Sequence, residues 1–268
     1  MKTSRKEEPP IARTQRPMVE VLRSFAAKRL NELANHPDIR PFIADPDEGV
    51  LDLTGQVRNE SNVLLLGEHG GCMLLKLTPA LYEVHTLVRP EGRGPWALSM
   101  AKAVLRWMFC NTDACEVVTR VPHGHQAART LSVAAGMKFE LTRPDGSRFM
   151  GQVTPIDLYA ITIQDWVQKD QMLEQIGART HAEMREQAKK IGITEPPHEE
   201  DLDHNRIVGA CTEMMIGGQL PKAVSLYNRW AQVARHKTIE LVTLDPPTIR
   251  MDVGLIRLVS GKLEIVKC

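Results

Sequence analysis

The sequence predicts an α/β fold with a mixed central sheet flanked by helices, plus a C-terminal extension of helices and strands. One stretch, Tyr82 to Gly136, contains an apolar strand, a loop with two glycines, a long amphipathic helix, a second strand and a second helix. This order and spacing are typical of a βαβα unit. Two shorter apolar runs precede the stretch, and a chain of 268 residues is long enough for a second domain.

Composition and charge exclude several classes of protein. The 34 Lys and Arg against 33 Asp and Glu leave a net charge of +1, which favours neither nucleic acid nor a membrane as partner. The five cysteines are scattered and no signal peptide or long apolar run opens the chain, so we expect a cytoplasmic protein with reduced thiols. Cys110, Cys115, His123 and His125 do not have the spacing of a closed zinc site, so no metal is expected.

The N-terminal part begins with a polar segment. Residues 1–16 hold charges and prolines with almost no apolar side chains, a composition that predicts a flexible arm. Apolar residues at steps of three and four then predict a helix that begins at Pro17 and ends near Asn35. The following segment contains three prolines, and we expect a loop there with a short helical turn and an edge strand.

Three strands are expected before the central loop. Asn62 to Gly67 and Gly71 to Leu77 are two short apolar runs around a connection that contains glycine, a pattern that predicts a hairpin. Tyr82 to Val88 is the third strand.

The loop after this third strand has the features of an anion site. Gly92 and Gly94 lie in it, and the long helix opens at Pro95. Loop amides and the positive end of the helix dipole would point to where a phosphate could lie, and Arg89 and Arg93 add positive charge.

The remaining elements of the first domain follow at regular spacing. A strand is expected from Cys115 to Val121 and a helix from about Gln126 to Ala135. We then expect a hairpin whose two strands are Met137 to Leu141 and Arg148 to Val153, joined by a turn at Asp145–Gly146.

We expect the first domain to span residues 17–157 and a C-terminal α+β interaction domain to span residues 158–268. Four helices and a strand-rich end are expected in the second domain. The predicted helices are Ile163 to Ile176, Thr180 to about Ile191 behind a capping box, Glu199 to Gly217, and Leu220 to His236.

The first domain resembles the GNAT superfamily of N-acetyltransferases. Val88 to Gly94 (VRPEGRG) is similar to the V-x-P-E-x-R-G start of that family's acyl-CoA loop, and Ala128 is followed eight residues later by Gly136. The resemblance covers roughly Pro17 to Val153. The segments HPDIRPFI, YEVHTLVRPEGRG, RWMF, TDA and TRVP look closest to GNAT-like proteins encoded by tailed bacteriophages.

The resemblance implies acetyl-CoA as a cofactor. In the family, backbone groups of the fourth strand bind pantetheine, and loop amides cradle the pyrophosphate through a Q/R-x-x-G-x-G/A motif. The motif can be aligned in two registers. A register that begins at Arg89 matches the motif literally. A register that begins at Arg93 agrees with the V-x-P-E-x-R-G pattern but places Trp96 and Leu98 where the family has small residues. We prefer the second. The expected cofactor-binding residues are Leu87, Val88, Arg89, Gly92, Arg93, Gly94 and Trp96.

Acetyl transfer to an amine needs a base and an acid. Glu83 and His85 share one face of the third apolar strand, so either could act as the base, directly or through a water molecule. The family often has a tyrosine, as the acid, four residues before the glycine that matches Gly136. In this chain that position is Ser132. His125 stands where the family usually has asparagine.

Three interpretations of function stay open. The first is an acyl-CoA-dependent N-acyltransferase that transfers acetyl to an amine by direct attack. The second is a non-catalytic GNAT-fold structural or interaction component of a tailed-phage virion, which would place the protein in the virion and not in the host cytoplasm. The third is an ordinary enzyme that dimerises through its C-terminal domain.

Expected partners are other proteins or a second copy, bound through the arm and the C-terminal domain. The acceptor pocket would be formed by residues 36–55, which do not identify the acceptor.

Overall fold

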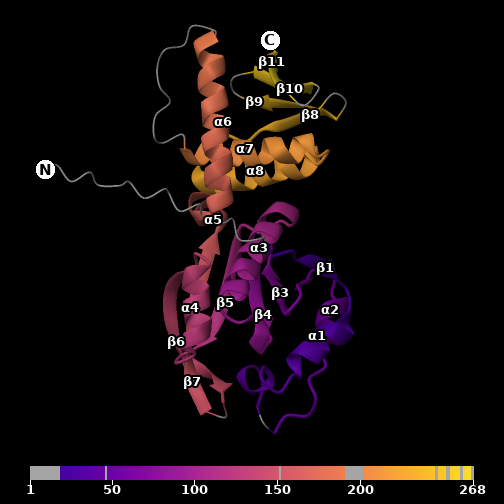
Figure 1. Ribbon diagram of the computed structural model, residues 1–268, viewed down its shortest axis with the longest axis vertical. Helices are drawn as coiled ribbons and strands as arrows, with labels where there is room; N and C mark the ends of the chain where they lie inside the picture. The colour runs from indigo at the N-terminus through magenta and orange to yellow at the C-terminus, as the bar shows by residue number, and fades with distance from the viewer. Residues whose placement is uncertain are drawn as a thin grey trace, which may run out of the picture.

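The structure, a computed structural model, has two parts (Figure 1). It describes residues 19–45, 47–150, 152–190, 202–244, 247–251, 254–259 and 262–266. A large sheet with its helices forms one part, and helices α5 to α8 with a small sheet form the other. The predicted arm, residues 1–16, lies outside the described residues.

The large sheet has seven strands in the order β1-β2-β3-β4-β5-β7-β6. β4 and β5 pair in parallel, and all the other neighbouring strands of this sheet pair antiparallel. The predicted mixed sheet flanked by helices and the predicted hairpin of β2 and β3 are therefore confirmed. The strands are β1 (Leu22–Ser24), β2 (Val63–Leu66), β3 (Gly70–Thr78), β4 (Leu81–Val88), β5 (Glu116–Pro122), β6 (Lys138–Phe149) and β7 (Gln152–Thr162).

Each face of this sheet has its own hydrophobic core. One core joins α1 (Ala27–Ala34) and α2 (Thr54–Arg58) to buried residues of β2, β3 and β4, Leu87 among them. The other core joins α3 (Pro95–Asn111) and, at its margin, α4 (Gln126–Ala134) to the opposite side of the strands. Alternate residues of β4 therefore face different helices.

The predicted helix from Pro17 is wrong over its first half. Leu22–Ser24 forms the edge strand β1, which pairs with β2, and the helix begins only at Ala27. Leu22 and Phe25, which belong to the helical pattern, are 60% and 70% exposed, so that pattern does not describe a buried face. Pairing with β2 satisfies backbone groups of this segment, and this tertiary contact overrides the local preference. The edge strand expected between residues 36 and 55 is replaced by the short helix η1 (Arg40–Phe42) and loop.

The predicted turn at Asp145–Gly146 is also wrong. β6 runs through these residues, and its register with β7 shifts between Arg143 and Ser147. The extra residues are absorbed as a bulge within the strand, and the chain reverses after Phe149, where Met150 has φ of +51°. β7 continues to Thr162, past the position where we expected the first domain to end.

The C-terminal part contains α5 (Ile163–Lys169), α6 (Gln171–Lys190), α7 (Leu202–Ile216) and α8 (Leu220–Ala234). The helix start predicted at Thr180 is wrong, because α6 runs through it without a break. The break falls at Asp170, whose Oδ1 accepts hydrogen bonds from the amides of Met172 at 2.9 Å and Leu173 at 3.3 Å. An aspartate in this position caps the first turn of a helix.

The strand-rich end is confirmed as a four-stranded sheet in the order β11-β10-β9-β8. Its strands are β8 (Glu240–Leu244), β9 (Pro247–Met251), β10 (Gly254–Val259) and β11 (Lys262–Val266).

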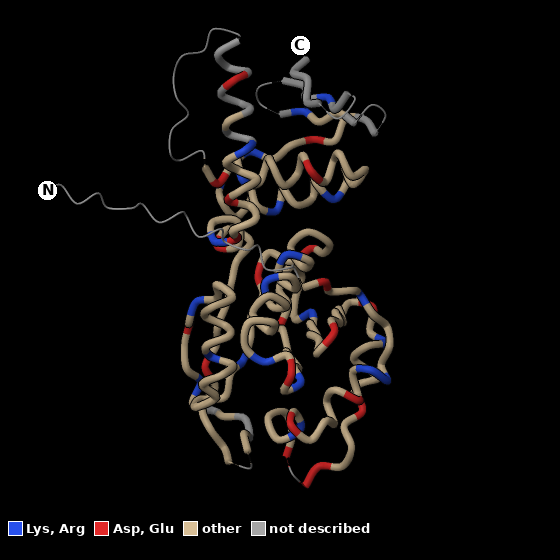
Figure 2. Tube along the Cα trace, in the orientation of Figure 1, with Lys and Arg blue, Asp and Glu red and all other residues tan. Residues whose placement is uncertain are grey.

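The two parts share one hydrophobic core. Phe109 of α3 stacks on Trp166 of α5 with ring centroids 5.2 Å apart, and Trp230 of α8 belongs to the same buried cluster. The Arg229 guanidinium donates to the carbonyls of Phe109 at 2.6 Å and Ala114 at 2.5 Å. Basic and acidic residues are interspersed in both parts (Figure 2). Within the described ranges, no helix is long and apolar enough to cross a membrane.

Candidate functional site

The sheet opens between β4 and β5. The two strands pair only from Leu81 with Glu116 to Glu83 with Val118, although β4 continues to Val88 and β5 to Pro122. The Thr119 hydroxyl donates to the Val84 carbonyl at 3.1 Å just beyond the last pair. Past this point, the two strands have no further ladder pairs among the described residues. This leaves backbone groups of β4, around Leu87 and Val88, without a strand partner on that side.

A small cavity lies at this opening, on the face that α3 and α4 cover. We call it the opening cavity. Its volume is about 40 Å³. Most of its lining is apolar, with hydroxyls from Thr86, Thr119 and Ser132. Its lining residues are Cys72, Val84, Thr86, Ala101, Val104, Leu105, Thr119, Leu131, Ser132, Ala135 and Met137.

The start of α3 supplies free amides at the end of β4. Gly94 precedes the helix with φ of +86° and ψ of −129°, a conformation that strongly favours glycine. Pro95 is the first helical residue, so the next amides, those of Trp96 and Ala97, have no carbonyl to bond within the helix. Gly92 has a different role: a Cβ there would lie 2.6 Å from the Cβ of His69, so this glycine permits close packing.

Trp96 does not line the opening cavity. Its half-buried ring lies over the turn between β2 and β3, 5.1 Å from the His69 ring and so close to Gly67 that a Cβ there would approach it to 3.1 Å. The large Trp96 side chain is therefore accommodated beside the start of α3.

The two arginines of the loop have different surroundings. The Arg93 guanidinium donates to the Asp38 carbonyl at 2.7 Å and so connects the start of α3 to the loop after α1. Arg89 donates its amide to the His69 carbonyl at 2.9 Å. The Arg89 Nε is buried and has no hydrogen-bond partner within the described ranges, which leaves a donor for a ligand oxygen.

Glu83 and His85 lie together, at the opening and on the α1 and α2 face. The Glu83 side chain is 2% exposed, and its Oε1 lies 3.1 Å from the His85 Nε2. Arg120 of β5 donates to both carboxylate oxygens, from Nε at 2.7 Å and Nη2 at 2.6 Å. Burial opposes ionisation of Glu83, but the hydrogen bonds from His85 and Arg120 outweigh it and lower its pKa to about 2.

Sequence reasoning missed Arg120. The sequence signal for Arg120 is the alternation of side chains along β5. Val118 is in register with Glu83, and Arg120, two residues later, lies on the same face of the strand. The parallel register between the two strands was needed to see that these two charges meet.

Ser132 and His125 both hold α4 in place. The Ser132 hydroxyl donates to the Ala128 carbonyl at 2.9 Å. His125 accepts from the Ala128 amide at 3.4 Å and stacks on Phe42 and Phe149, each with a centroid distance of 5.1 Å. Burial and the charge of Arg93 lower the pKa of His125. Phe42 thus brings the loop after α1 against α4 and the tip of the β6–β7 hairpin.

A second buried carboxylate lies on the face that α3 and α4 cover. Asp157 of β7 is in register with Val121, a residue of the core beneath α3. Its Oδ1 accepts from the Thr142 hydroxyl at 2.6 Å, and its Oδ2 lies 3.1 Å from the His123 Nδ1. Burial opposes ionisation of Asp157, but these two contacts outweigh it and lower its pKa below the usual range. No group of three or more His, Cys, Asp or Glu able to hold a metal ion occurs in the part of the chain that the structure describes.

No protein-family model and no curated protein matches the sequence. Solved structures similar to this chain include spermidine N-acetyltransferase from Vibrio cholerae in complex with CoA and spermine, with 13% identity and a TM-score of 0.49 over 56% of this chain and 98% of that one. AAC(6')-Ib in complex with paromomycin and acetyl-CoA has 13% identity and a TM-score of 0.46 over 57% of this chain and 97% of that one. At these identities, the function is inferred from the geometry of the site itself.

Proposed function

We propose that the protein is an acyl-CoA-dependent N-acyltransferase that transfers an acyl group from the thioester to an amine by direct attack. The observation that carries this proposal is the opening between β4 and β5. It leaves β4 backbone groups without a strand partner and ends at the free amides that start α3. An acidic and a basic side chain, Glu83 and His85, lie where the strands separate.

The cofactor fits the groups at the opening. Backbone groups of Leu87 and Val88 would bind the pantetheine arm. The amides of Trp96 and Ala97, with the positive end of the α3 dipole, would bind the pyrophosphate. Arg89 supports this placement, because its buried Nε lacks a partner among the described residues.

The base in this mechanism is His85. Both oxygens of Glu83 accept from Arg120 and its pKa is about 2, so this carboxylate is a poor proton acceptor at neutral pH. Glu83 instead holds the imidazole in place, and Arg120 keeps Glu83 ionised. His85 is 46% exposed, so an amine or a bridging water can reach it. It takes the amine proton as nitrogen bonds to the thioester carbon. The carbon–sulfur bond then breaks, and CoA leaves as a thiolate that takes up a proton.

Calorimetry with acetyl-CoA tests the cofactor site. We expect binding in the micromolar range, and Arg93→Glu should abolish it because the reversed charge would repel the pyrophosphate. Arg29→Glu is the matched control, because Arg29 is an exposed arginine of α1 outside the site, and its affinity should equal that of the unmodified protein. Absence of heat at millimolar acetyl-CoA would refute the proposal.

A second candidate is a non-catalytic component of a tailed-phage virion. The observation behind a non-catalytic role is the Ser132 hydroxyl, which already donates to a helix carbonyl and is a weak acid for the departing thiolate. This candidate predicts that the protein co-purifies with virions through several density-gradient steps. Recovery only from the soluble fraction of infected cells would exclude it.

A further inference from the structure

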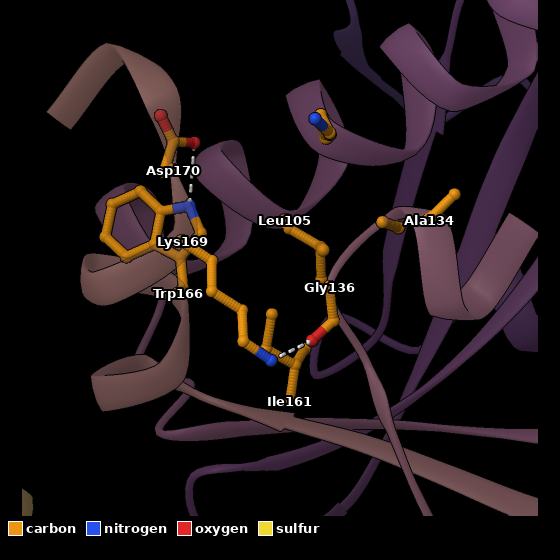
Figure 3. A pocket seen from close by; sticks show the side chains of 9 residues that line it. Leu105, Ala134, Gly136, Ile161, Trp166, Lys169 and Asp170 are labelled. Carbon is orange, nitrogen blue, oxygen red and sulfur yellow. Dashed lines mark hydrogen bonds between the residues drawn. The ribbon is translucent and has the colours of Figure 1, made fainter. Parts of the chain in front are cut away.

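A larger cavity adjoins the opening cavity beneath α3 and α4. Its volume is about 210 Å³, and it lies among α3, the residues that end α4, the end of β7, and α5 (Figure 3). Leu105 and Ala135 line both cavities, so the two spaces share part of their walls. Neither shared residue is aromatic or charged.

The walls of the larger cavity suit an aliphatic chain. Ile161 and Trp166 are buried residues of the shared core, and they line it together with Leu105. Figure 3 shows the Trp166 indole directed to Asp170, where its Nε1 donates at 3.1 Å. The polar edge of the indole is thus occupied and its ring contributes apolar surface.

Positive charge gathers at the polar edge of this cavity. Lys169 donates to the Gly136 carbonyl at 3.0 Å (Figure 3), and its charge helps to lower the pKa of Asp165, a carboxylate outside the cavity lining that Lys138 also binds. Lys102 also lines the cavity, and it makes no hydrogen bond or ion pair within the described ranges. The one carboxylate in the lining, Asp170, is held by the Arg106 guanidinium at 2.8 Å and 2.9 Å. The lysines therefore have no carboxylate in the lining left to pair with.

We propose that the acyl group transferred is longer than acetyl and ends in a carboxylate. Its carbonyl would lie at the opening between β4 and β5, its chain would pass Leu105 and Ala135, and its carboxylate would bind Lys102 and Lys169. The proposal rests on the acyltransferase function above. A two-carbon group would fit in the opening cavity of about 40 Å³ and leave the larger cavity without use.

The reaction is the same transfer with a different donor. The amine nitrogen bonds to the thioester carbonyl carbon, the carbon–sulfur bond breaks, and CoA departs as a thiolate that takes up a proton. His85 accepts the amine proton, and no oxidant or reductant is needed. The chemical result differs from acetylation, because a cationic amine becomes an amide with a negative terminus.

Two donors of equal chain length test the charge. Glutaryl-CoA and pentanoyl-CoA both carry five carbons, and only glutaryl-CoA ends in a carboxylate. By calorimetry we expect glutaryl-CoA to bind about tenfold more tightly or better, which is the size expected of charge-assisted hydrogen bonds. The double variant K102M/K169M should lose this preference and should bind acetyl-CoA as the unmodified protein does.

The control is Lys28→Met, because Lys28 is an exposed lysine of α1 that is remote from both cavities in the fold. It should keep the preference for glutaryl-CoA. Equal binding of glutaryl-CoA and pentanoyl-CoA by the unmodified protein overturns this inference and leaves the acyltransferase function standing. A preference that survives in K102M/K169M overturns the placement of the carboxylate. Failure of every acyl-CoA to bind, acetyl-CoA included, overturns both proposals.

Discussion

Two buried carboxylates of the large sheet each hold a partly exposed histidine, and they do so on opposite faces. Glu83 is 2% exposed and contacts His85, which is 46% exposed; Asp157 is 7% exposed and contacts His123, which is 60% exposed. The third partner differs. Glu83 accepts two hydrogen bonds from a guanidinium, whereas Asp157 accepts one from the Thr142 hydroxyl.

The difference separates two uses of the same pairing. A bidentate guanidinium fixes both the charge and the orientation of a carboxylate, and a hydroxyl fixes only its position. Glu83 lies where β4 and β5 separate, while Asp157 lies on β7 within a continuous β5–β7 pairing. We therefore expect the first histidine to serve the reaction and the second to hold β5 and β7 together.

The largest expected effect is on catalysis. His85→Gln should lower kcat about a hundredfold, since loss of a general base typically costs 10² to 10⁴. His123→Gln should leave kcat within about threefold. The measurement is thiol release from acyl-CoA against a panel of primary amines. Equal losses in the two variants would show that the two histidines do not differ in function.

The next effect is on stability. Glu83→Gln should lower the free energy of unfolding by about 3 kcal/mol at neutral pH, because the pKa of the carboxylate falls from 4.5 to about 2 on folding. Asp157→Asn should cost about 2 kcal/mol, the size expected for loss of a hydrogen bond to a charged group in a buried position. Urea unfolding measures both. A larger loss of unfolding free energy in Asp157→Asn than in Glu83→Gln would contradict the role assigned to the Arg120 guanidinium.

The smallest effect is the pH dependence of the stability that Glu83 contributes. The folded pKa of Glu83 is depressed, so its contribution is fully present above about pH 4.5 and is lost as the pH falls toward 2. The gap in unfolding free energy between the unmodified protein and Glu83→Gln should shrink by about 1 kcal/mol between pH 7 and pH 4. Urea unfolding at a series of pH values measures it, and a gap that widens in acid would refute the assignment.

The sequence predicted the elements whose signals are local. β4, α3, β5 and α4 were placed to within a few residues, because their periodicity and their flanking glycine and proline residues lie within each segment. Glu83 and His85 were placed correctly on one face of β4 by simple alternation. The role of each candidate as catalyst or cofactor ligand stays a prediction.

The errors share one cause, which is pairing with a distant partner. Leu22–Ser24 became a strand because the edge of β2 was free, and Asp145–Gly146 was drawn into β6 because β7 continued beside it. Asp170 ends α5 and caps α6 while Arg106 of α3 binds its carboxylate from 64 residues away in sequence. None of these partners is visible in a local window.

By itself, the sequence determined that this chain builds a mixed sheet with an acidic and a basic side chain on one face of its fourth strand. Periodicity and glycine placement suffice for that, because they act through the backbone over a few residues. Only the tertiary structure decided that Arg120, 37 residues beyond Glu83, binds that acid through both carboxylate oxygens. The reason is physical: a buried charge takes its properties from whichever group the fold places within hydrogen-bonding distance.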